Sequence, residues 1–241
     1  KYFLFFPAKD YNGIFRIGVA VGENPEGPFI PMDKPIEGSF SIDPAVYKDD
    51  NGEYYMYFGG IWGGQLQRWR DGVFNPSNPT SPTAFLPNDD EHALLPFVAK
   101  MSDDLLEFAE KPREVQILDE TGKLLLAGDN ERRFFEAAWV HKYNGKYYFS
   151  YSTGDTHFIC YAIGDNPYGP FTYKGKILNP VVGWTSHHSI CEFKGKWYLF
   201  YHDSSLSKGV THLRSIKIAE IQYDKEGLIR TLDPYNDFSI L

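Results

Sequence analysis

Long apolar runs, cysteine pairs and an excess of positive charge are all missing from this sequence. The two cysteines, Cys160 and Cys191, show no Cys-x-x-Cys spacing, which argues against a zinc or redox motif. No segment reaches about eighteen consecutive apolar residues, so no transmembrane helix is expected. The 24 Lys and Arg residues are outnumbered by 32 Asp and Glu, and the net charge of −8 argues against nucleic acid or an anionic membrane as the main partner. The lack of an evident disulfide framework favours a cytoplasmic location slightly over a secreted or periplasmic one.

Aromatic residues, by contrast, are abundant and occur in a repeated pattern. Phe, Tyr and Trp make up 17% of the 241 residues. The segments 51–58, 144–151 and 194–201 each begin with a turn containing Gly and continue as an alternating aromatic run. An apolar strand precedes each turn, and this order is typical of an antiparallel hairpin. Residues 1–6 resemble the same aromatic strand without its turn.

A second repeated element is a Pro-Gly turn at 24–29 and again at 166–171. Asn at the first position and Pro at the second fit a type I turn. Together the two elements predict units of four strands in roughly 50 residues, and four-stranded units repeated radially form a β-propeller. The Pro-rich segment 75–92 is predicted to be a surface loop inserted into one single domain that spans 1–241.

The chain opens inside an apolar strand that has no preceding partner strand. We therefore expect that the first strands of the propeller lie upstream of Lys1, so that about four blades are present. The alternative is a closed propeller of four blades with a degenerate first strand.

Polar residues occupy equivalent places at the starts of three of the predicted hairpins: Asp43, Glu136 and His187. A propeller brings such positions to one rim of its central channel, so these side chains are expected to converge. Glu136 stands between two Phe and two Ala, where a carboxylate is costly to desolvate unless it is paired or protonated. A proton held near neutral pH is what a general acid requires. Each residue also has an ordinary structural explanation: an Asp-Pro turn for Asp43, an ion pair with a neighbouring Arg for Glu136, and packing for His187.

These motifs resemble glycoside hydrolase family 43, in the branch of β-xylosidases and α-L-arabinofuranosidases. The resemblance rests on 41–50, on Phe135 and Glu136 before a strand, and on His187 with the segment 195–202. It implies a five-bladed β-propeller and an inverting hydrolase acting on oligosaccharides or aryl pentosides. It also implies that Glu136 is the general acid, Asp43 the residue that tunes the pKa of the acid, and Arg214 a substrate contact. His187 would coordinate a calcium ion, directly or through water, and no organic cofactor is implied.

One family feature is missing, because the Asp-Pro motif expected to carry the catalytic base has no counterpart other than Asp43 itself. We therefore expect the base to lie upstream of Lys1 and this polypeptide alone to be inactive or nearly so. Release of nitrophenol from aryl xylosides and arabinosides would test this expectation.

Several side chains near the predicted channel are candidates for sugar subsites. Trp62 lies among glycines that let a backbone approach a ligand, and Gln65 offers an amide to a sugar hydroxyl. Phe135 flanks the acid, and His157 follows an aromatic strand. For the aromatic residues, core packing is the ordinary alternative. Two other functions remain open: a non-catalytic carbohydrate-binding propeller, and a fructan- or sucrose-cleaving relative.

Overall fold

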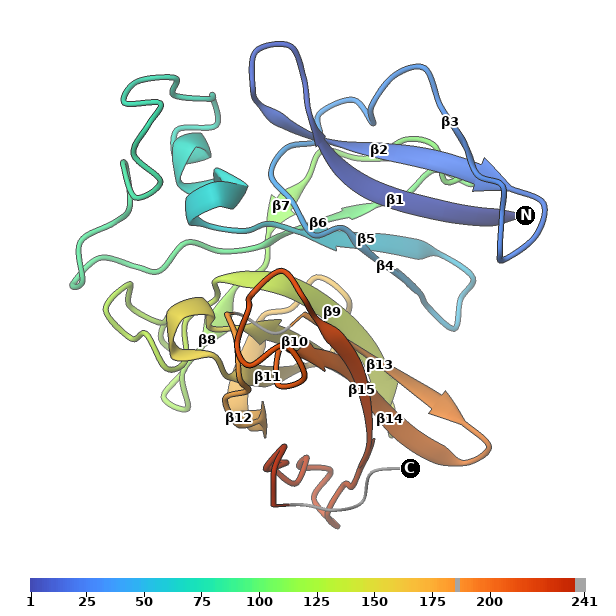
Figure 1. Ribbon diagram of the computed structural model, residues 1–241, viewed down its shortest axis with the longest axis vertical. Coiled ribbons are helices and arrows are strands. Elements are labelled where there is room, and N and C mark those ends of the chain that lie inside the picture. Colours follow the sequence, from blue (N-terminus) through green and yellow to red (C-terminus); the bar gives the residue numbers. More distant parts are fainter. Residues whose placement is uncertain (185–186, 237–241) are drawn as a thin grey trace.

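The computed structural model describes residues 1–184 and 187–236 and consists almost entirely of β-strands (Figure 1). The strands form four sheets, each built on antiparallel neighbours in chain order. The first is β1(Tyr2–Lys9), β2(Phe15–Gly22) and β3(Ile30–Pro31), and the second is β4(Ala45–Lys48), β5(Tyr54–Phe58), β6(Phe97–Lys100) and β7(Arg113–Glu114).

The third sheet contains β9(Glu136–Tyr143), β10(Lys146–Ser152), β11(Ile159–Gly164) and β12(Phe171–Leu178), with β8(Ile117–Leu118) added in parallel to β12. The fourth contains β13(His188–Phe193), β14(Lys196–Asp203) and β15(Ser215–Ile221). Three short 3₁₀ turns complete the structure: η1(Trp62–Gly64), η2(Leu66–Trp69) and η3(Gly154–Thr156). None of the described helices is long and apolar enough to cross a membrane. The fold class is as predicted: an all-β propeller of the five-bladed kind, with four blades in the described residues.

The predicted hairpins and turns are present. Asn144 and Gly145, between β9 and β10, both have positive φ, as do Lys194 and Gly195 between β13 and β14. Two consecutive positive φ angles are what a tight two-residue hairpin requires. In the two Pro-Gly turns, the N–H of Gly27 donates to Asn24 O and that of Gly169 to Asn166 O, at 3.0 and 3.1 Å.

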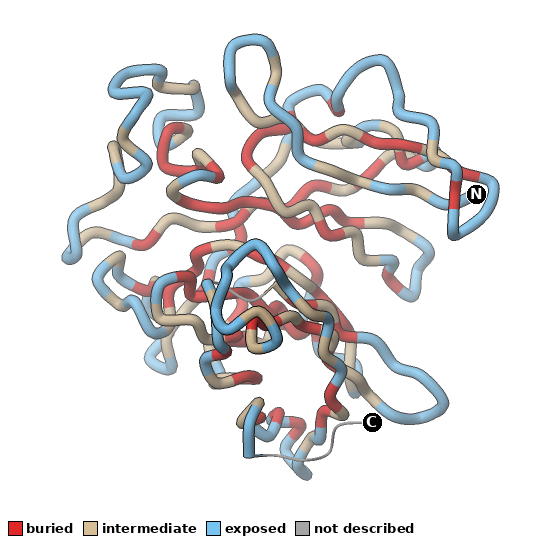
Figure 2. The backbone as a smooth tube through the Cα atoms, viewed as in Figure 1, coloured by how far each residue is buried: buried red, intermediate tan, exposed pale blue. Residues whose placement is uncertain are grey.

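The core lies between the blades, where the aromatic strands face one another (Figure 2). Tyr57, Phe58, Phe149 and Tyr151 are fully buried, so the repeated aromatic strands supply the packing surface of the blades. The segment 75–92 contains no strand, and its Leu86 packs against this core.

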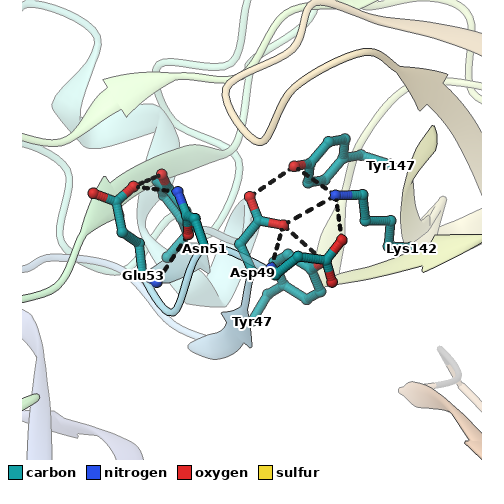
Figure 3. A network of polar contacts seen from close by, with 8 residues as sticks. Tyr47, Asp49, Asn51, Glu53, Lys142 and Tyr147 are labelled. Carbon is teal, nitrogen blue, oxygen red and sulfur yellow. Dashed lines mark hydrogen bonds and ion pairs between the residues drawn. The ribbon is translucent and has the colours of Figure 1, made fainter. Parts of the chain in front are cut away.

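A polar network joins the second and third blades at the hairpin ends of their strands (Figure 3). The carboxylate of Asp49 accepts a hydrogen bond from Tyr147 OH at 2.7 Å, and Lys142 Nζ lies 3.3 Å from its other oxygen. Lys142 also reaches Asp50 at 2.8 Å. Asp49 is only 7% exposed, so this network holds two blades in a fixed relation. The opposite ends of the same strands carry the predicted site.

Candidate active site

Three blades meet where Asp43, Glu136 and His187 lie. Asp43 precedes β4, Glu136 begins β9 and His187 precedes β13, and β9 contacts both β4 and β13. One ligand atom from each of the three side chains lies within 4.8 Å of the others. The predicted convergence is therefore confirmed. His187 Nε2 lies 3.0 Å from Asp43 Oδ2, and the Asp43 side chain is 12% exposed.

A β-bulge positions Glu136. The register between β9 and β10 shifts between the pairs Ser152–Glu136 and Ser150–Trp139, so β9 holds one extra residue there. Ala137, in the bulge, has a φ of 63°. Bulges leave one residue outside the ladder and change the direction of its neighbours. The N–H of Ala137 is thereby turned toward Asp43 and donates to its Oδ2 at 3.1 Å.

The backbone around Asp43 is also irregular and is held by a buried serine. Ser41 and Asp43 both have positive φ, which is uncommon outside glycine and least costly for Asp and Asn. Ser41 Oγ donates to Gly64 O at 2.7 Å and accepts the N–H of Gly60 at 3.0 Å. A β-carbon on Gly60 would stand 2.6 Å from Ile42, so only glycine fits there. The turn that carries Asp43 is therefore locked to the segment after β5.

His187 is polarised by its neighbours. Burial by itself would lower the pKa of His187, but the charge of Asp43, its hydrogen bond and the charge of Glu136 together raise the pKa above its ordinary value. The backbone N–H of His187 donates to His202 Nε2 at 3.1 Å. Burial, and then the positive charges of Arg214 and His187, lower the pKa of His202 to about 4. His202 is therefore a neutral acceptor that holds the backbone of His187.

Arg214 is an exposed residue next to His202, at the edge of this cluster. Its Nε donates to Thr211 O at 2.9 Å, and its Nη1 is 3.5 Å from His202 Nε2. The side chain thus stands beside the cluster, as predicted, and its role toward a substrate stays a prediction.

An aromatic group borders the cluster. Trp62 packs edge-on against Phe135, with ring centroids 5.2 Å apart, and tilts against Trp184 at 5.8 Å. His157 packs edge-on against Trp184 at 5.2 Å. Phe135 is 2% exposed, so in this structure it is a core residue that supports Trp62. Trp184 is 38% exposed and is available to a ligand.

The amide of Gln65 is already used by the first blade. Its Oε1 accepts the N–H of Phe15 at 3.0 Å, and its Nε2 donates to Gly13 O at 2.9 Å. Gln65 therefore joins the β1–β2 hairpin to the segment after β5, and this contact accounts for the residue without a sugar. A sugar contact of Gln65 stays a prediction.

Two residues of the site, His202 and Trp184, carry no signal in the sequence that points to their place. His202 lies near the end of the aromatic strand β14, and only its contact with His187 shows that it supports the cluster. Trp184 lies in a segment without a repeat signal and joins Trp62 to His157 only in space.

The donor set of the cluster does not fit direct coordination of calcium. Calcium takes six to eight oxygen ligands, whereas the three side chains offer only two carboxylate groups and one imidazole nitrogen. The Nε2 of His187 is also directed at Asp43. A calcium ion near His187, held through water, stays a prediction, and no chemical step is derived from it.

Comparison with known proteins places the chain in a well-populated group. The profile of glycosyl hydrolases family 43 matches residues 1–84 and 85–229. A xylosidase/arabinosidase of Bacteroides ovatus is 64% identical over 97% of this chain and 70% of its own length. A β-xylosidase of Xylanibacter ruminicola is 62% identical over 96% of this chain and 70% of its own length.

Solved structures agree with the sequence comparison. A family 43 β-xylosidase/α-arabinofuranosidase from a compost microbial metagenome, solved with xylotriose in a calcium-free form, superimposes with a TM-score of 0.93 at 64% identity. The match covers 97% of this chain and 70% of that one. An enzyme from Xanthomonas citri, solved with xylose, gives a TM-score of 0.92 at 56% identity and covers 99% of this chain and 70% of that one.

Proposed function

This chain belongs to the glycosyl hydrolases of family 43, and we propose that it hydrolyses xylosides and arabinosides with inversion at the anomeric carbon. The observation that carries the proposal is the convergence of Asp43, Glu136 and His187 from three blades. Relatives with 62–64% identity are a xylosidase/arabinosidase and a β-xylosidase. Solved relatives hold xylose or xylotriose, which supports a pentose-containing oligosaccharide as the substrate.

Glu136 is the general acid of the proposed reaction. It stands at the start of β9, where the bulge fixes its direction, and its carboxyl faces the other members of the cluster. In the reaction its proton passes to the glycosidic oxygen as the bond to the anomeric carbon breaks. The leaving sugar therefore departs as a neutral alcohol.

Asp43 is the positioning and tuning residue. Its Oδ2 accepts a hydrogen bond from the Ala137 N–H and lies 3.0 Å from His187 Nε2. These contacts hold the carboxylate beside the backbone that carries Glu136. A negative charge at this distance favours the protonated form of a neighbouring carboxyl group. In the proposed mechanism, Asp43 thus keeps Glu136 protonated until Glu136 transfers its proton to the glycosidic oxygen.

The spacing of the two carboxyl groups argues that Asp43 is not the catalytic base. An inverting glycosidase separates its acid and base by about 6.5–9.5 Å, to leave room for the attacking water. Oxygen atoms of Asp43 and Glu136 lie within 4.8 Å of each other. The water-activating carboxylate of the proposed mechanism is therefore a third group, separate from this pair.

The proposal is tested with Glu136→Gln, which removes the proton while keeping the size of the side chain. Loss of a general acid costs about 10²–10⁴-fold in rate, and the loss is larger for xylobiose than for nitrophenyl xyloside, because nitrophenolate leaves without a proton. Hydrolysis of both substrates and calorimetric binding of xylose are measured together. Retained binding with a selective loss on xylobiose supports the proposal. Measurable xylobiose hydrolysis that Glu136→Gln leaves unchanged contradicts the proposal.

A further inference from the structure

The third and fourth blades meet next to the cluster without a strand ladder between them. β9 and β13 contact each other but belong to different sheets, so no row of backbone hydrogen bonds fixes their relative position. Glu136 begins β9, and His187 immediately precedes β13. The separation of these two side chains therefore depends on what else joins the two strands. Apolar packing excludes water but has no preferred direction, so by itself it sets this separation only loosely.

Two side-chain hydrogen bonds join the strands at this point. Ser150 Oγ lies 2.6 Å from His188 Nε2. The indole Nε1 of Trp139 donates to Ile190 O at 3.1 Å. We call these two bonds the inter-blade clamp. Ser150, His188 and Ile190 are buried, and a hydrogen bond tolerates only a narrow range of distance and angle. The inter-blade clamp therefore fixes a position that packing leaves free.

On the third blade, both bonds start from the residue pair that borders the bulge. Ser150 and Trp139 stand opposite each other in the ladder of β9 and β10, just before the register shift. Beyond the shift, Glu136 stands opposite Ser152. Residues directly opposite in an antiparallel pair lie on the same face of the sheet. One face of the third blade thus carries both groups of the inter-blade clamp, within three positions of the acid along β9.

On the fourth blade, both bonds end beside the histidine of the cluster. His188 follows His187 directly, and Ile190 lies two residues further along the same strand. β13 is an edge strand with β14 as its only neighbour in the sheet, and Trp139 supplies a partner to its backbone. No loop separates these bonds from the cluster. A shift of β13 relative to β9 therefore moves His187 relative to Glu136.

We propose that the inter-blade clamp sets the position of the general acid Glu136 relative to His187. This inference rests on the proposed function, because Glu136 is an acid only in that reaction. The four residues of the inter-blade clamp act through the two strands and are positioning residues. A misplacement of about 1 Å can cost on the order of 10²-fold in rate, so the proton transfer from Glu136 is the step that depends on the inter-blade clamp.

The first test compares two substrates in Ser150→Ala and Trp139→Phe, each of which removes one bond of the inter-blade clamp. Xylobiose needs the proton of Glu136, whereas nitrophenolate leaves nitrophenyl xyloside without one. A misplaced acid is therefore expected to lower the rate on xylobiose by about 10–100-fold and the rate on nitrophenyl xyloside by less than about threefold. A loss of folded protein lowers both rates equally and leaves their ratio unchanged.

The matched control is Tyr148→Phe. Tyr148 lies two residues from Ser150 on the same strand, and its buried hydroxyl donates to Gly227 O at 2.7 Å. Like Trp139→Phe, this variant keeps an aromatic ring and removes one donor to a backbone carbonyl, but the lost bond does not involve β13. We expect a lower midpoint of thermal unfolding and an unchanged rate ratio. The rescue variant is His188→Gln, whose amide offers Ser150 a new partner and is expected to keep most of the ratio.

Amide hydrogen exchange, followed by nuclear magnetic resonance, gives a second readout that needs no turnover. The N–H of Ala137 donates to Asp43 Oδ2, and that of His187 donates to His202 Nε2. Both amides therefore report on how the blades meet at the cluster. Each variant that breaks the inter-blade clamp is expected to accelerate exchange at these two amides about tenfold more than at the other strand amides. In Tyr148→Phe, the two amides follow the rest of the chain.

The inference requires the change in exchange and, wherever the parent chain has measurable turnover, the change in rate ratio. Absence of either change in both Ser150→Ala and Trp139→Phe overturns it and leaves the proposed function intact. If Ser150→Ala does not fold, as judged by circular dichroism, Trp139→Phe decides the question. If the parent chain hydrolyses neither substrate, the exchange measurement decides it. A parent chain that neither hydrolyses these substrates nor binds xylose counts against the proposed function, which is a different pattern.

Discussion

Acid is expected to destabilise this fold through a histidine that is buried without a countercharge. His141 in β9 is 4% exposed, and its ring stacks on Tyr148 and tilts against Trp197, with centroids 5.0 and 5.1 Å apart. Its Nε2 lies 2.7 Å from Tyr223 OH, and its Nδ1 has no hydrogen-bond partner within the described residues. Burial alone lowers the pKa of His141 to about 3.

The direction and size of the effect follow from linkage. The unfolded chain has an ordinary histidine pKa of about 6.5, so it binds the proton more tightly than the folded state does. The contribution of His141 to stability is therefore complete above pH 6.5 and is lost as the pH falls from there toward 3. At about 1.36 kcal/mol for each pH unit, the free energy of unfolding falls by about 2 kcal/mol at pH 5 and by about 3 kcal/mol at pH 4.

The assay is urea unfolding followed by far-ultraviolet circular dichroism at pH 7, 6, 5 and 4, for the parent chain and His141→Phe. Phe fits the aromatic stack but removes the hydrogen bond between His141 Nε2 and the hydroxyl of Tyr223, so the variant loses about 1–3 kcal/mol at pH 7. Its further loss between pH 7 and 5 is about 2 kcal/mol smaller than that of the parent. His212→Gln, at an exposed histidine, is the control and follows the parent. An equal acid dependence in His141→Phe and the parent would refute the reasoning.

Two further predictions concern the backbone under the acid and the junction of the blades. Gly154→Ala places a β-carbon 2.1 Å from the ring of Phe135 at a φ of +75°, so we expect it to destabilise the fold by more than about 2 kcal/mol and to lower activity by displacing Glu136. Asp49→Asn weakens the bonds to Tyr147 and Lys142 and is expected to cost about 1–3 kcal/mol at pH 7. Because hydrogen bonds to Tyr147, Asp50 and Lys142 outweigh its burial and lower the pKa of Asp49, this cost vanishes as the pH falls below about 4.

Thermal unfolding measures the loss of stability in both variants, and hydrolysis of an aryl pentoside measures the loss of activity in Gly154→Ala. Gly13→Ala is the control for the first prediction, because Gly13 has the same φ of +75° with no atom within 4 Å of the added carbon. If Gly154→Ala is as stable as Gly13→Ala, the ring of Phe135 can move away from the added carbon at little cost, and the prediction is wrong. For the second prediction, Asp165→Asn removes an exposed carboxylate and is expected to change stability by less than about 1 kcal/mol. A pH-independent difference between Asp49→Asn and the parent would contradict the account of the network.

The blades and the cluster of three residues were predictable because their signals are local. Alternating aromatic strands and Gly-containing turns are short-range patterns, and both are dictated by the geometry of a hairpin. The equivalence of the repeats then placed Asp43, Glu136 and His187 at the same end of neighbouring strands. The structure confirms that end as the meeting point. The roles of the three side chains in catalysis remain predictions.

The contacts around the cluster were not predictable, because they join residues far apart in the sequence. The bulge at Ala137 gives its N–H to Asp43 across 94 positions, and Gln65 reaches the first hairpin across 50. His202 and Trp184 gain their places only through neighbours on other segments.

By itself, then, the sequence of this protein determined a repeated β-architecture and the rim on which its acidic residues gather. Each repeat contains the residues that favour its own strands and turns. Because the repeats are alike, they form equivalent blades with equivalent ends. Only the tertiary structure decided how close Asp43 and Glu136 lie, and which side chains, such as that of Gln65, already have partners. Those properties depend on how separate blades pack, and packing distances of a few ångströms leave no periodic trace in the chain.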